Sequence, residues 1–221
     1  MEVDPEHGIG IDVILNRRLW GDINLKADYY HYEIDDYVVY AKWGSAYFKK
    51  SPWGRRMVNL NEVVKDGLEL QINGHLFDRL SFYVSYAYSD WDFHGPKTGP
   101  QGSAAEKLGD RARHRVNAGI GYNVFKNTCL LMDYKYQDEQ IAHICEEEPP
   151  ESGFWHCYDN PMDSYHVVNF AIEQKLFTKH PYIKDARVKF YINNLFDEDY
   201  ENMRGYPMTD RTFGGSISFR F

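Results

Sequence analysis

The residues most suited to metal or redox chemistry lie between positions 143 and 162, in a polar and acidic stretch. They offer thiol, thioether, imidazole and carboxylate groups, which proteins use to bind copper and zinc. The set comprises His143, Cys145, Glu146, Glu147, Glu148, Glu151, His156, Cys157 and Met162. Its spacing matches no compact zinc motif such as a paired C-x-x-C. The sequence therefore favours an acidic loop without a metal, closed in an oxidising compartment by a disulfide between Cys145 and Cys157, with Cys129 left as a buried thiol.

A second candidate site is the basic run RARHR, which spans residues 111–115 at the start of an alternating segment. Side chains two residues apart in a strand point to the same face, so Arg111, Arg113 and Arg115 should line up. Such a row could attract an anionic substrate, or it could pair with carboxylates of a facing protein surface. Of the two, pairing with carboxylates is favoured, and the row remains a candidate site for an anionic ligand.

No arrangement typical of an enzyme accompanies these clusters. The sequence has no hydrolase triad order, no glycine-rich phosphate loop and no zinc-hydrolase helix motif. Its formal net charge of -8 would repel a nucleic acid. We therefore expect neither an enzyme nor a nucleic-acid-binding protein, and no bound cofactor.

The elements that must position these residues are β-strands. In runs such as LSFYVSYAYS at 80–89, large apolar residues alternate with small or polar ones, which is the pattern of a strand with one apolar face. Each predicted strand is long enough for the ~9 to 11 residues that a tilted strand needs to cross a bilayer. The nine predicted strands are 8–18, 22–40, 57–74, 79–92, 110–124, 128–138, 163–176, 186–196 and 210–221.

The connections between these strands alternate between short and long. Long connections are predicted at 41–56, 93–109, 139–162 and 197–209, with short turns between them. Outer-membrane barrels have this asymmetry, with short periplasmic turns and long extracellular loops, so we expect all the long connections at one end of the sheet. A soluble β-sandwich or lipocalin-like barrel also alternates, but its strands are usually shorter.

Composition agrees with a membrane barrel and excludes a helical membrane protein. The mean hydropathy is −0.61, and no apolar run approaches the ~18 to 20 residues of a membrane helix. Aromatic residues make up 16% of the chain, with 18 Tyr, which is typical of the aromatic girdles at the two membrane interfaces. The first residues, MEVDPEHGIGIDV, lack the basic and apolar regions of a signal peptide.

The C-terminal run INNLFDEDYENMRGYPMTDRTFGGSISFRF resembles the terminal signature of TonB-dependent receptors. Asn-Leu-Phe-Asp ends a strand, Tyr and Gly-Tyr-Pro follow, and an Arg opens a last alternating strand with an aromatic end. These positions are Asn194, Leu195, Phe196, Asp197, Tyr200, Gly205, Tyr206, Pro207, Arg211 and Phe221. Asp210 stands where the family often has Gly. More loosely, the runs at 4–38 and 59–90 resemble earlier strand pairs of the same barrel.

The resemblance implies a fold and a domain organisation. Residues 1–221 would be the C-terminal part of a barrel of roughly 22 strands, without the plug domain that folds inside it. The fold class is therefore all-β, an antiparallel transmembrane β-barrel segment of about nine strands that does not close. With nine antiparallel strands the first and last run in the same direction, and open edges in lipid would leave unsatisfied backbone groups at several kcal/mol each. The segment is expected to need the missing N-terminal strands.

The resemblance also implies a function. The family imports ferric siderophores, haem, cobalamin or other metal complexes across the outer membrane of Gram-negative bacteria. TonB supplies the energy by binding an N-terminal region that residues 1–221 do not include. This segment would supply wall, lumen lining and outer loops, and would not work alone. The alternative is a passive porin-like or structural barrel, and the sequence does not indicate the transported substrate.

Two sets of residues acquire roles in such a barrel. Arg111, Arg113 and Arg115 should face the lumen or its rim, because a lipid-facing Arg costs ~2 to 4 kcal/mol at mid-bilayer. The final strand should present an apolar face to lipid, and the resemblance implies that the barrel-insertion machinery recognises such a terminal aromatic strand. The residues of that face are Phe213, Ile217, Phe219 and Phe221.

Overall fold

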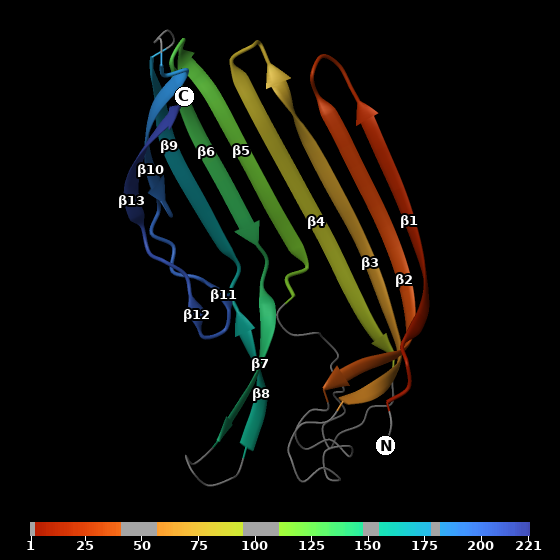
Figure 1. Cartoon of the computed structure of the whole chain (residues 1–221). Coiled ribbons are helices and arrows are strands. Elements are labelled where there is room, and N and C mark those ends of the chain that lie inside the picture. The colour runs from red at the N-terminus through yellow and green to blue at the C-terminus, as the bar shows by residue number, and fades with distance from the viewer. Residues whose placement is uncertain (1–2, 41–56, 95–110, 148–154, 178–181) are drawn as a thin grey trace.

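The computed structural model describes residues 3–40, 57–94, 111–147, 155–177 and 182–221 (Figure 1). Nine long strands form one open, curved antiparallel sheet. In sheet order they are β1 (His7–Arg18), β2 (Asn24–Tyr40), β3 (Met57–Leu76), β4 (Leu80–His94), β5 (His114–Phe125), β6 (Thr128–Gln137), β9 (Tyr165–Phe177), β10 (Asp185–Asn193) and β13 (Thr212–Arg220). The predicted all-β fold with nine strands is confirmed. The described residues include no helix that is long and apolar enough to span a membrane.

The pairing of the strands aligns apolar residues with apolar residues and polar residues with polar residues across the sheet. One continuous cross-strand row is apolar and links Phe82, Ile120, Met132, Phe170, Ile192 and Phe213. A row on the opposite face is mostly polar and links Asn16, Lys26, Gln71, Ser85, Asn117 and Lys135. Because successive side chains of a strand point to opposite faces, the sheet has one apolar and one polar face.

The connections alternate as the sequence predicts. Short turns join β1 to β2, β3 to β4 and β5 to β6 at one end of the sheet, which is the upper end in Figure 1. The long connections leave β2, β4, β6 and β10 at the other end. Residues 41–56 and most of 93–109 lie outside the described residues, but their flanking strands place both connections at this end. The expectation that all long connections share one end is confirmed.

Two small hairpins that the sequence did not predict occupy the last two long connections. In the first, β7 (Gln140–Glu147) pairs with β8 (Trp155–Met162). In the second, β11 (Glu201–Met203) pairs with β12 (Tyr206–Pro207). Figure 1 shows β7 and β8 extending the line of β6 and β9 beyond the end of the large sheet. Both hairpins therefore belong to the end that carries the long connections.

The apolar face is open to its surroundings. Ile9 is 75% exposed and Ile217 is 63% exposed, whereas a soluble sheet covers such a face with a second layer. Near the end with the long connections, the Tyr86 hydroxyl lies 2.9 Å from His114 Nδ1, and the Tyr134 hydroxyl lies 2.8 Å from His166 Nδ1. Paired polar aromatic groups at the edge of an apolar band are typical of the girdle at a membrane interface.

Candidate ligand-binding wall

A cluster of rings and cations lies on the polar face, near the end with the long connections. The register places Lys65 between Tyr32 on β2 and Trp91 on β4. The Lys65 ammonium lies 4.6 Å from the ring centre of Tyr30, 5.6 Å from that of Tyr32 and 5.0 Å from that of Trp91. The Arg111 guanidinium lies 4.1 Å from the ring centre of Trp91. We call these five residues the mouth cluster.

Tyrosine rings of this face lie across glycines of the neighbouring strand. Tyr30 covers Gly67, and Tyr32 covers Gly10, so that a Cβ atom at either glycine would collide with the ring. The Tyr32 hydroxyl donates a 2.7 Å hydrogen bond to Asp12. The glycines thus let the two tyrosine rings lie flat against the sheet, where they support the Lys65 ammonium.

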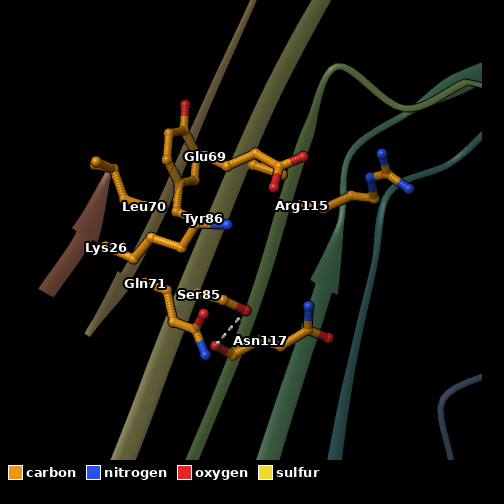
Figure 2. Close-up of a pocket in the computed structure, with 9 residues that line it drawn as sticks. Lys26, Glu69, Leu70, Gln71, Ser85, Tyr86, Arg115 and Asn117 are labelled. Carbon is orange, nitrogen blue, oxygen red and sulfur yellow. Dashed lines mark hydrogen bonds between the residues drawn. The ribbon is translucent and has the colours of Figure 1, made fainter. Parts of the chain in front are cut away.

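Further along the same wall lies a polar hollow of about 320 Å³ (Figure 2). Most of the side chains that line it are polar or charged, and Figure 2 shows Leu70 and Tyr86 pointing away from them. The Ser85 hydroxyl and the carbonyl of Asn117 are 3.5 Å apart. The polar side chains are Lys26, Glu69, Gln71, Ser85, Arg115 and Asn117. The hollow and the mouth cluster can therefore contact the same solute on one face of the sheet.

The three arginines of the basic run have three different surroundings. Arg111 belongs to the mouth cluster and Arg115 lines the hollow, so both accompany the polar face. Arg113 instead forms a 2.9 Å ion pair with Asp90, which shares the face of Tyr88. Arg113 thus has a different partner from Arg111 and Arg115, although its carbonyl still accepts a 3.0 Å hydrogen bond from the Ser89 amide, and a lumen-facing role for all three arginines stays a prediction. Sequence reasoning also missed Lys65 and Trp91, which only the register of β3 and β4 brings together.

The last connection folds onto the polar face beside β6 and β9. Tyr165, only 2% exposed, donates a 2.6 Å hydrogen bond to the Asn202 side chain, which also accepts a 3.2 Å bond from Lys135. The Tyr165 and Tyr200 rings contact each other at a tilt of 37° with centres 4.4 Å apart, and burial raises the pKa of Tyr200. Arg204 reaches across to the Pro161 carbonyl at 2.8 Å. These bonds join the β11–β12 hairpin to the base of the β7–β8 hairpin.

Residues 3–195 match the family model described as TonB dependent receptor-like, beta-barrel. The chain belongs to this family. The residues on which the C-terminal resemblance to TonB-dependent receptors rests form much of the connection between β10 and β13. Asn194, 3% exposed, accepts a 2.8 Å bond from the Glu198 amide, and Asp197 accepts a 2.7 Å bond from the Arg211 amide. Both Asn194 and Asp197 have positive φ, which Asn and Asp tolerate better than most residues.

Solved structures of receptors confirm the fold of this barrel segment. A complex of FpvA from P. aeruginosa with heterologous pyoverdines is 14% identical, with a TM-score of 0.71, and the match covers 97% of this chain and 27% of that one. The ferric-catecholate import receptor Fiu from K12 E. coli is 14% identical, with a TM-score of 0.67 and coverage of 97% and 28%. The copper transporter OprC is 15% identical, with a TM-score of 0.70 and coverage of 100% and 32%. No curated protein matches the chain.

The receptor-barrel chain thus spans about a third or less of these solved receptors. At such low identity the matches establish the fold and leave the transported compound open. The contribution of this chain to uptake depends on the side chains of its own polar face.

The last strand of this chain, β13, pairs with β10 and carries its aromatic residues on the apolar face. Ile217 lies opposite Val188, and Phe213 lies opposite Ile192. Ser216 and Ser218 occupy the alternate positions, and Phe221 follows the end of the strand. The arrangement is the one expected for a strand with one face toward lipid. Recognition of Phe213, Ile217, Phe219 and Phe221 during assembly stays a prediction.

The two loop cysteines are placed by backbone register. Cys145 on β7 is the direct cross-strand partner of Cys157 on β8. Directly opposed residues in antiparallel strands have Cα atoms about 4.5 or 5.5 Å apart, which is within disulfide reach. The side chains of residues 143–147 and 155–159 lie outside the described part, as do residues 148–154. The disulfide and the absence of a metal in this loop therefore stay predictions. Cys129 is a half-buried free thiol.

Proposed function

We propose that this chain forms the C-terminal wall of an outer-membrane receptor that imports a metal complex with energy from TonB. The receptor-family match over residues 3–195 supports this function over the passive porin-like alternative. The candidate cargoes are a ferric siderophore, haem, cobalamin or another metal complex. In the complete receptor, a plug domain and further strands precede this wall, and TonB binds the region before the barrel. The cell location is the outer membrane of a Gram-negative bacterium.

The main observation behind this proposal is that the two faces of one sheet differ in character: one is apolar and exposed, and the other is polar. The apolar face is exposed across strands long enough to span a bilayer, which suits contact with lipid. The polar face holds the mouth cluster and the hollow, which suits a water-filled lumen. The hairpins and long connections at one end are placed to contact a solute that arrives from outside.

Growth under nutrient limitation tests the proposal. A Gram-negative strain without its own metal receptors would receive the whole receptor and be supplied in turn with ferric siderophores, haem, cobalamin and a copper complex. We expect growth on at least one of these that requires both the receptor and a functional TonB. Entry of small solutes that persists without TonB, with no TonB-dependent growth on any metal complex, would support the passive porin and overturn the proposal.

A further inference from the structure

We infer that the mouth cluster is a recognition site for a multiply anionic, oxygen-rich metal chelate, and that it discriminates against neutral chelates. The inference rests on the proposed function and specifies its substrate class. It comes from the position and surroundings of two cations, Lys65 and Arg111, together with the three rings that hold them.

Within the described part of the chain, the carboxylates nearest in effect to Lys65 are those of Glu69 and Asp12, and they act on it only through longer-range attraction. Among the described residues, no Asp or Glu oxygen lies within ion-pair distance of Lys65 or Arg111, although both share the ring of Trp91. Several other arginines of the described residues do have a carboxylate partner: Arg113 pairs with Asp90 at 2.9 Å, and Arg187 pairs with Glu173 at 2.8 Å. Two like charges beside one indole repel each other, and an anion placed between them would relieve that repulsion.

The rings hold this site ready for a ligand. The Trp91 indole nitrogen donates a 3.0 Å hydrogen bond to the Ser89 hydroxyl, and the Tyr32 hydroxyl is bonded to Asp12. The Tyr30 and Tyr32 rings cannot move closer to the sheet, because they already contact Gly67 and Gly10. An aromatic ring beneath a cationic side chain restricts its conformations and leaves the charged group accessible to solvent. The loss of side-chain entropy when an anion binds is therefore small.

The side chains of the hollow also favour anionic ligands. Lys65 and Glu69 lie four residues apart on β3, which corresponds to about 13 Å along a strand. Lys26, Arg115 and two amide side chains in the hollow offer further donors to oxygen atoms, while Glu69 is the one acidic residue that lines it. A large chelate that presents several anionic oxygens can contact both regions in succession. A neutral chelate gains no charge-assisted contact at either.

Binding to the purified whole receptor in detergent tests the inference, with three probes of defined charge: trianionic iron(III) tris-catecholate, a neutral iron(III) trihydroxamate and cyanocobalamin. We expect the wild-type receptor to prefer the tris-catecholate. Arg111→Gln and Lys65→Gln should each raise its Kd about tenfold or more, whereas Lys65→Arg should retain most of the affinity. Heat-modifiable electrophoretic mobility would show that each variant is folded.

Arg113→Gln is the matched control, because it removes one positive charge two residues from Arg111 but from an existing ion pair with Asp90. Its Kd for the tris-catecholate should change less than about twofold. A wild-type preference for a neutral probe, or an equal loss from Arg111→Gln and Arg113→Gln, overturns the inference while leaving the proposed function in place. If the receptor binds no probe and also fails every TonB-dependent growth test, both proposals fall.

Discussion

At the scale of single residues, the polar face depends on tyrosines packed over glycines. Four such cross-strand contacts occur in the described residues, and in each the ring occupies the space that a Cβ would need. The pairs are Tyr32 with Gly10, Tyr30 with Gly67, Tyr83 with Gly119 and Tyr191 with Gly214. A tyrosine ring fills the space above the glycine, which has no side chain, and the contact fixes the register of the two strands. The high tyrosine content therefore serves the lumen wall as well as the girdles.

Gly119→Val tests this packing. The Tyr83 ring lies over Gly119, and its hydroxyl donates a 2.8 Å hydrogen bond to Asp133 on β6. A branched side chain must displace the ring and break that bond, which should lower the free energy of unfolding of the whole receptor by about 2 kcal/mol. Denaturant unfolding followed by heat-modifiable mobility measures the change. Gly215→Ala is the control, since the nearest atom to its added Cβ is 3.4 Å away; an equal loss in both variants would refute the packing argument.

The disulfide is also a residue-scale prediction. Because Cys145 and Cys157 are direct cross-strand partners in the backbone register of β7 and β8, receptor prepared from an oxidising compartment should yield a peptide pair linked through these cysteines, with Cys129 alkylated. Closing a loop of this size is worth about 3 kcal/mol in the chain-entropy model, so reduction should make the hairpin more sensitive to protease. Non-reducing peptide mass spectrometry decides the matter. Free Cys145 and Cys157 thiols, or tight copper or zinc binding that Cys145→Ser abolishes, would contradict the prediction.

At the scale of elements, the sequence predicts the long strands and the positions of the long connections well, but not the hairpins inside those connections. The period-two pattern extends over nine or more residues in each long strand, so the alternation outweighs local irregularities. The β11–β12 hairpin has only two short strands, and its place depends on hydrogen bonds from Tyr165 and Gln140 to Asn202, far away in the chain. The ion pair of Arg113 also could not be predicted from the sequence, because its partner Asp90 lies on another strand. Such placements depend on register, which a single sequence does not specify.

The final strand gives a prediction about assembly. β13 has one neighbour in this sheet, β10, and its aromatic residues share the apolar face. An edge strand with a continuous apolar face can pair with the open edge of the insertion machinery while that face meets lipid. Deleting Phe221 from the whole receptor should therefore reduce its amount in the outer membrane, with little change in ligand affinity per inserted receptor. Unchanged abundance with weakened affinity would instead assign Phe221 to a ligand site.

At the scale of the whole molecule, the two edges of the sheet determine what the chain can do. β1 and β13 each pair with a single strand, and an antiparallel order of nine makes them run in the same direction. They cannot pair with each other in an antiparallel barrel, and two copies arranged around one barrel axis would meet through parallel edges. A closed antiparallel barrel therefore requires an odd number of additional strands between them, roughly 13 if the barrel has the ~22 strands of plugged transporters.

This requirement predicts the behaviour of the 221 residues expressed by themselves. Exported with a signal peptide, they should not appear in the outer membrane as a protease-resistant, heat-modifiable species, because each unpaired backbone group at the edges costs several kcal/mol in lipid. Supplying the preceding strands and plug as a second polypeptide should restore such a species, since both edges then gain partners. Membrane fractionation followed by electrophoresis with and without heating measures this outcome. A folded monomer obtained from the 221 residues alone would show that the edges are satisfied in another way, and would refute the argument that this sheet depends on further strands.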